Sequence, residues 1–118
     1  MSNRLPSRIV NDILSCIGHL QHYTANLSFN DIKGNFMVVE ACLYNIHIIG
    51  EAVTQLDEDV KLSEPHVPWV LIKGMRNRLI HEYFGTDLAI VWNVIKVELP
   101  GFKSNLENLY QRLTDKGR

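Results

Sequence analysis

The chain has 118 residues, 46% hydrophobic and 21% charged, so it can bury one core but not two, and we treat residues 1–118 as a single domain. This composition excludes intrinsic disorder. Twelve Lys and Arg against 13 Asp and Glu give a formal net charge of -1, which excludes a protein that coats long nucleic acids by neutralising phosphates. Any nucleic-acid contact therefore needs a local basic patch, and Lys73, Arg76 and Arg78 lie close together on one predicted helix.

The cysteines and the N-terminal region indicate the cellular compartment. Cys16 and Cys42 lie in apolar helical stretches, where we expect the reduced core thiols of a cytosolic protein. Asn11, Asp12 and His19 interrupt the apolar pattern near the N-terminus, so no secretory signal is predicted. No run approaches the roughly 18 apolar residues of a membrane span. We therefore expect a cytoplasmic protein.

The first half of the chain predicts two long helices. The first spans about residues 6–24 and begins at Pro6, whose fixed φ suits a first helical turn. A connector with capping residues follows over 26–35 and allows one short turn at 29–33. The second helix spans about 35–56 and should be buried over most of its circumference, since it carries two adjacent apolar stripes. One stripe consists of Phe36, Val39, Leu43, Ile46, Gly50 and Val53, where Gly50 would let another helix pack closely.

A polar line also follows the second helix. Glu40, Tyr44, His47 and Glu51 recur at i, i+4, i+7 and i+11. One interpretation is a solvent-facing edge, as most charged stripes are. The other is that Glu51, and with it His47 and Tyr44, approaches the helix of Arg76 and orients its arginine. The pattern alone leaves both open.

A polar loop over 57–67 should lead into a third helix over 68–84. Pro68 suits the first helical position, and Gly85 suits the left-handed residue after the helix ends. Trp69 lies in the first turn, where its ring can seal the end of a bundle. Gly74 in the helix interior costs about 1 kcal/mol relative to alanine, which a close helix contact or a dimer contact would explain. The core contacts of this helix are predicted to come from Val70, Leu71, Met75, Leu79 and Ile80.

The last segment predicts a fourth helix over 87–99 and a fifth that starts at Pro100. Their apolar residues repeat at helical spacing, and no stretch is a convincing strand. The fold class is therefore all-α, an up-and-down four-helix bundle with a short fifth helix or an extra turn. The fifth helix would bury Phe102, Leu106, Leu109 and Leu113.

The third helix concentrates reactive side chains between Arg76 and Gly85. Histidine titrates near neutrality, and arginine can hold two phosphate oxygens at once, so Arg76 and His81 suit the cleavage of a phosphodiester. In RNA the 2′-hydroxyl of the substrate is the nucleophile, and neither a metal nor a protein nucleophile is required. At about 100° per residue the two side chains diverge by about 140°. A shared site then needs the reach of the arginine, a frayed last turn, or a second copy of the helix.

The order of short motifs along the chain resembles a known family. Residues 76–81, Arg-Asn-Arg-Leu-Ile-His, resemble the Arg-x4-His motif of HEPN-domain ribonucleases. Extended by Tyr83, they resemble the HepT branch, the toxin of HEPN/MNT toxin–antitoxin pairs. Residues 48–52, 67–69, 83–87, 91–92 and 99–100 fall where that branch has similar sequences. The resemblance covers nearly the whole chain and implies a HEPN-like fold.

The resemblance also implies roles for individual residues. His81 would act as general acid or base and Arg76 would stabilise the charged phosphorane, giving a 2′,3′-cyclic phosphate without a metal or cofactor. Asn77 and Glu51 would support these two, and Arg78 and Lys73 would bind RNA. Tyr83 would receive AMP from the partner nucleotidyltransferase antitoxin, which silences the toxin. The family also implies a homodimer that brings two motifs into one cleft.

Two other functions compete with this one. A non-catalytic helical subunit could bind a nucleotidyltransferase and present RNA or nucleotide to it, and the intact pair of Arg76 and His81 argues against this alternative. A metal-binding bundle is disfavoured because the paired Glu-x-x-His motifs of such bundles are absent. Without the resemblance, His81 would be read as a structural histidine at a helix end and Arg76 as a salt-bridged surface residue.

Overall fold

The computed structural model describes the backbone of residues 4–81 and 87–118 and the side chains of residues 4–76 and 87–118. The described part of the chain is all-α and contains no strand, as predicted. Its helices are α1 (Pro6–Thr24), α2 (Phe29–Ile32), α3 (Phe36–Gln55), α4 (Glu58–Leu62), α5 (Trp69–His81), α6 (Leu88–Asn93), a π-helical turn (Val94–Glu98) and α7 (Leu99–Asp115).

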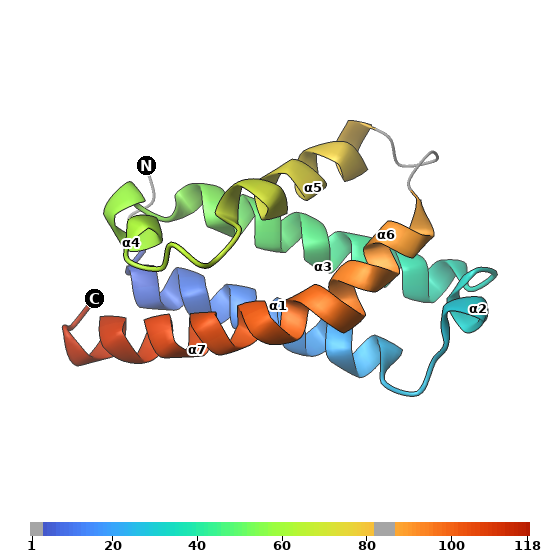
Figure 1. The fold of residues 1–118 in the computed structure, drawn as a ribbon, viewed down its shortest axis with the longest axis horizontal. Coiled ribbons are helices and arrows are strands. Elements are labelled where there is room, and N and C mark those ends of the chain that lie inside the picture. The colour runs from blue at the N-terminus through green and yellow to red at the C-terminus, as the bar shows by residue number, and fades with distance from the viewer. Residues whose placement is uncertain (1–3, 82–86) are drawn as a thin grey trace.

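The long helices run side by side along the longest axis of the molecule (Figure 1). α1 packs against α3 and α7, and α5 packs against α3. The short helices α4 and α2 lie at opposite ends of the bundle (Figure 1). The chain reverses direction between successive long helices, which gives the up-and-down arrangement.

The core is formed by apolar stripes of α1, α3 and α7. The α1 stripe is fully buried at Ile13, Ile17 and Leu20. The α7 stripe is buried at all four predicted positions, Phe102, Leu106, Leu109 and Leu113. Burial of each large aliphatic side chain stabilises the fold by about 1.5–3 kcal/mol. Tertiary packing, more than helix propensity, therefore holds this bundle together.

The predicted loop over 57–67 is wrong in part, because it contains the helix α4. α4 and the loop that follows it lie next to Trp69. The indole Nε1 of Trp69 donates hydrogen bonds to the carbonyl oxygens of Lys61 and Glu64, at 3.0 and 3.2 Å. Its ring packs edge-on against Phe102. Trp69 thus seals this end of the bundle, as its place in the first turn of α5 predicts.

The predicted fourth and fifth helices are one continuous helical segment. Pro100 has no N–H and its ring clashes with the carbonyl four residues earlier in a regular α-helix. The π turn Val94–Glu98 precedes it, and the N–H of Leu99 donates to the carbonyl of Val94. The wider turn lets the chain pass the proline without a break. It also places Lys96 over the Trp92 ring at 5.0 Å, with Nζ donating to the carbonyl of Thr24 at 2.8 Å.

Several predicted core residues are exposed. Val70 and Leu71 in α5 are 84% and 69% exposed, and Phe36 at the start of α3 is 75% exposed. The buried residue of the first turns of α5 is Ile72, and Met75 packs partly against the core. Leu79 and Ile80 lie outside the described side chains. The apolar pattern of α5 is therefore wider than the surface that α3 covers.

The composition of α3 bears on the expectation that no segment spans a membrane. By length and composition it is apolar enough to cross a membrane. A core helix of a soluble protein passes the same test, and α3 buries eight residues in contact with α1 and α5. Cys42 is one of these, and burial raises the pKa of its thiol to about 11 although Lys96 opposes the shift. Cys16 is buried too, and both cysteines are free, as predicted.

Candidate functional site

α3 and α5 pack closely where Gly50 meets Arg76. A β-carbon built at Gly50 would lie 2.3 Å from Cβ of Arg76 and 2.5 Å from its Cγ, which no side chain tolerates. Gly50 is therefore required for the arginine stem to lie across α3. The close helix approach that Gly50 predicts is confirmed, and its partner is the arginine of the Arg-x4-His motif.

The next residue of α3 holds the head of the same arginine. Nη1 of Arg76 donates to Oε1 of Glu51 in a salt bridge. The Arg76 side chain is 17% exposed and that of Glu51 is 42% exposed, so the pair lies at the surface with the arginine mostly covered. Adjacent residues of one helix thus fix both the stem and the charge of Arg76. The prediction that Glu51 approaches Arg76 is confirmed as a contact.

Arg76 keeps hydrogen-bonding capacity for a ligand. A guanidinium has five N–H donors in a planar fork, and the Glu51 pair uses Nη1. Nε is buried and has no hydrogen-bond partner in the described part of the protein. A buried donor without a partner costs free energy, so an acceptor that reaches it is favoured. The remaining donors match the oxygens of a phosphate.

The structure describes the other predicted site residues unequally. Lys73 is exposed on α5, one turn before Arg76. Asn77, Arg78 and His81 belong to the same helix, but their side chains lie outside the described residues. Tyr83 lies outside the described residues altogether, as does Gly85. The described geometry therefore joins Arg76 to Glu51 and leaves the other predicted contacts untested.

The residues of the polar line of α3 differ in whether they contact Arg76 or face solvent. Glu51 pairs with Arg76, whereas Tyr44 is 65% exposed and Glu40 is exposed. His47 is half-buried. Among the described side chains, Glu51 is the member of this line for which a contact with Arg76 is observed. The solvent-edge interpretation therefore fits the exposed position of Tyr44.

One buried polar contact had no clear signal in the sequence. Asn45 is 5% exposed in the core face of α3. Its Oδ1 lies 3.1 Å from Nδ1 of His19, and its Nδ2 donates to the carbonyl of Ala41 at 2.8 Å. His19 also stacks on Tyr23. These contacts give His19 a structural role between α1 and α3.

An apolar groove runs along the other side of α5, where it faces α6 and the π turn. It has a volume of about 740 Å³. Nothing lies within 4 Å of a β-carbon built at Gly74, so no contact within the described chain explains this glycine. The lining residues are mostly apolar: Val70, Leu71, Gly74, Met75, Ala89, Ile90, Asn93, Val94 and Glu98.

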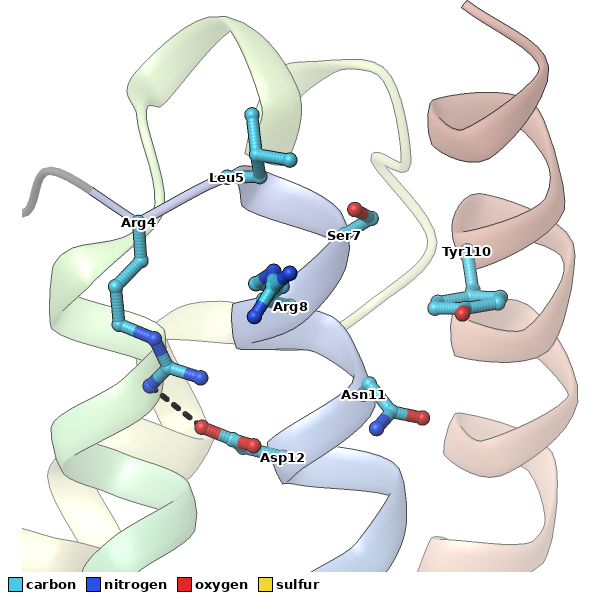
Figure 2. Close-up of a pocket in the computed structure, with 7 residues that line it drawn as sticks. All are labelled: Arg4, Leu5, Ser7, Arg8, Asn11, Asp12 and Tyr110. Carbon is cyan, nitrogen blue, oxygen red and sulfur yellow. Dashed lines mark ion pairs between the residues drawn. The ribbon is translucent and has the colours of Figure 1, made fainter. Parts of the chain in front are cut away.

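A polar pocket of about 470 Å³ lies on α1, beside α7 (Figure 2). Arg4 pairs with Asp12 at 2.5 Å across its left side, and the ring of Tyr110 borders it from α7 (Figure 2). Arg8 is exposed and contributes a second cation. Because the carboxylate of Asp12 offsets Arg4, the net charge of the lining is weak. This pocket is a poorer phosphate site than the arginine buried against α3.

No metal-binding cluster is present in the described ranges. Among residues 4–76 and 87–118, no three His, Cys, Asp or Glu side chains are placed to share an ion.

Comparison with known proteins identifies the family. Residues 13–109 match the family described as “Ribonuclease HepT-like”, a range that contains all of α3 and α5. The chain belongs to the HepT-like ribonuclease family. Its HEPN-type fold and its Arg-x4-His motif agree with that assignment.

Curated relatives of this HepT-like protein carry ribonuclease names. “Putative RNase MJ0125” of Methanocaldococcus jannaschii is 33% identical over 105 residues, 89% of this chain and 90% of the relative. “Probable ribonuclease HepT” of Thermococcus cleftensis is 34% identical over 102 residues, 83% of this chain and 89% of the relative. No solved structure gives a significant match.

Proposed function

We propose that this HepT-like protein is a metal-independent endoribonuclease whose catalytic residues are Arg76 and His81. The observation that carries the proposal is the fixation of Arg76 by Gly50 and Glu51, within the Arg-x4-His motif of a HepT-like chain. An arginine whose stem and head are both held before substrate binds loses little entropy when it receives a phosphate. Such preorganisation is expected of a catalytic cation and is not needed in a surface residue.

The proposed reaction is an internal transesterification of RNA. His81 removes the proton of the 2′-hydroxyl, the 2′-oxygen forms a bond to phosphorus, and the bond to the 5′-oxygen breaks. The same histidine, or that of a second subunit, returns a proton to the leaving oxygen. Arg76 stabilises the charge that develops on the phosphorane. The products are a 2′,3′-cyclic phosphate and a 5′-hydroxyl, and no cofactor takes part.

Neighbouring polar residues of α5 are proposed to support the reaction. Asn77 lies one turn before His81 in sequence and would position the phosphate or fix the tautomer of the histidine. Lys73 is exposed and would attract the RNA backbone, together with Arg78. These contacts supply the local basic patch that a chain of net charge -1 requires.

A homodimer is proposed to complete the site. By helical periodicity position 81 falls within about 20° of position 70 and of position 74, while position 76 faces α3. Val70 and Gly74 line the apolar groove, and no part of the described chain covers this face of α5. A second copy seated on this groove would bury Val70 and Leu71 and bring two motifs together. The exposure of these two apolar side chains is then explained.

Control by a partner is the remaining part of the proposal. We propose that the protein is the cytoplasmic toxin of a HEPN/MNT toxin–antitoxin pair and that an MNT-type nucleotidyltransferase silences it by placing AMP on Tyr83. The added phosphate would compete with RNA for the cations of the motif, and the adenine would block entry. The support is the HepT-like family membership together with the Arg-x4-His-x-Tyr sequence.

The test is cleavage of labelled RNA by the purified protein in excess EDTA, with identification of the product ends. We expect cyclic phosphate ends from the wild type and little cleavage by Arg76→Ala or His81→Ala. Arg8→Ala is the matched control, because Arg8 is an exposed arginine on α1 and not part of the motif. Cleavage that needs a metal, or that survives in His81→Ala, would reject the mechanism. Wild-type protein that binds a nucleotidyltransferase but leaves all RNA intact would favour the non-catalytic subunit.

A further inference from the structure

Tyr44 is a large aromatic side chain that the fold does not use. It is 65% exposed on α3 and makes no hydrogen bond, ion pair or ring contact with any residue of the described chain. Two other tyrosines differ from it: Tyr23 stacks on His19, and Tyr110 packs against the core. Exposing an aromatic ring to water gains nothing for folding. The exposed ring is therefore available to bind a ligand.

The position of Tyr44 relates it to the candidate active site. It precedes Glu51 by seven residues, which is about 20° short of two full helical turns and about 10 Å along the axis. Tyr44 and Glu51 therefore share one line on the surface of α3. Because Glu51 holds Arg76, that line leads from the exposed ring to the guanidinium.

The charges on the two helices distinguish what each can bind. The α3 line carries no lysine or arginine, and the carboxylate of Glu51 is paired with Arg76, so this line does not attract phosphate. The facing helix α5 carries the cations Lys73 and Arg76. An RNA strand that lies along the contact between these helices would turn its phosphates to α5 and its bases to α3. A carboxylate also accepts hydrogen bonds from the amino groups of bases.

We propose that Tyr44 is a stacking platform for an RNA base close to the phosphate held by Arg76. Single-stranded RNA is commonly bound by stacking of its unpaired bases on aromatic side chains. Such stacking tolerates any base, because every base has a π face. The inference rests on the proposed ribonuclease function and adds a substrate-binding residue to it. It predicts that the substrate is single-stranded at this point, since a paired base cannot stack on a tyrosine.

The binding test uses short single-stranded RNA with 2′-O-methyl groups, which cannot be cleaved, and a fluorescent label. We expect Tyr44→Ala to weaken binding about tenfold and Tyr44→Phe to bind like the wild type, because the ring and not the hydroxyl makes the contact. The salt dependence of affinity should be unchanged in Tyr44→Ala and reduced in Lys73→Ala, because only the lysine neutralises a phosphate. Tyr23→Ala is the control for loss of a tyrosine elsewhere.

A second arm locates the base. Removing the base at one nucleotide at a time should weaken wild-type binding at one position and have no further effect there in Tyr44→Ala. Equal affinity of wild type and Tyr44→Ala would overturn the inference while leaving the ribonuclease proposal intact. A change of oligomeric state in Tyr44→Ala would also overturn it, by showing a protein contact instead. Failure of the wild type both to bind and to cleave RNA would reject the underlying function.

Discussion

Gly50 and Arg76 are packed so closely that the β-carbon of any other residue at position 50 would overlap the arginine stem. This contact fixes where α5 crosses α3. It also brings Glu51, the next residue of α3, to the guanidinium. Gly50 and Glu51, which are adjacent in the sequence, thus fix the position of the Arg76 side chain.

Gly50→Ala should destabilise the protein. The new methyl group would lie 2.3 Å from Cβ of Arg76, and relieving this overlap has to move a helix or change a rotamer. Such overpacking costs about 1–3 kcal/mol. Gly18→Ala is the matched control, because Gly18 also lies inside a helix and has nothing within 4 Å of its β-carbon. That change should stabilise the protein by about 0.5–1 kcal/mol. Urea unfolding of both variants measures the difference, and equal stabilities would contradict the contact.

Glu51→Gln should lower the rate of cleavage by roughly 10- to 100-fold, because a mispositioned catalytic group has effects of this size. In the proposed mechanism Glu51 positions Arg76, so the loss should appear mainly in kcat while the unfolding free energy changes little. Glu64→Gln is the control, since Glu64 pairs with Arg112 in a similar salt bridge away from the motif. Glu51→Asp should restore part of the rate. If Glu64→Gln lowered the cleavage rate as much as Glu51→Gln, the pair of Glu51 and Arg76 would have no particular role in cleavage.

The contact of Glu51 with Arg76 is one of two interpretations of the sequence, and helical spacing alone does not distinguish Glu51 from the other residues of the polar line. His47 and Tyr44 lie on the same polar line and satisfy the same helical period. The three residues differ in their position along α3 relative to the point where α5 crosses it, and the glycine at position 50 fixes that crossing point. A steric constraint between distant segments is invisible to periodicity, which describes one helix at a time.

The errors in the fold have similar causes. Val70 and Leu71 are predicted core residues because they are apolar, yet an apolar pattern does not say which surface covers it. The π turn before Pro100 was missed because the proline was read as the start of a new helix. By contrast, the ends of α1 and α3 were predicted to within a residue or two, since Pro6 and Asn35 mark their first turns.

The buried thiol of Cys42 gives the protein a pH-dependent stability above neutrality. Burial raises its pKa from an ordinary 9.0 to about 11, with Lys96 opposing the shift. Between pH 9 and 11 the unfolded chain therefore loses this proton while the folded chain keeps it. The unfolding free energy should fall as the pH rises through this window. Urea unfolding at several pH values measures the slope, and Cys42→Ala should reduce it. An unchanged slope in that variant would assign the effect to other groups.

Leu71→Asp should convert the proposed dimer into monomers. Leu71 lines the groove between α5 and α6 and is 69% exposed. A charge there would have to be desolvated in the interface, which is costly without a partner. Leu62→Asp is the matched control, because Leu62 is also 69% exposed but lies on α4. Sedimentation should show a dimer for the wild type and the control and a monomer for Leu71→Asp, with loss of RNA cleavage in the monomer. A wild type that cleaves RNA as a monomer would refute the two-subunit site.

Tyr83→Phe should abolish silencing by the nucleotidyltransferase. Co-expression with an MNT-type partner should add one or more AMP units to the wild-type protein, and intact mass measures them directly. In the proposed modification the phenol is the acceptor, so its loss should remove the modification while keeping the ring. Tyr44→Phe is the control, since Tyr44 is an exposed tyrosine on a different helix and should leave modification unchanged. The modified protein should fail to cleave RNA, because the added phosphate competes for Arg76. AMP addition that persists in Tyr83→Phe would move the acceptor to another residue, and no addition at all would leave complex formation as the means of restraint.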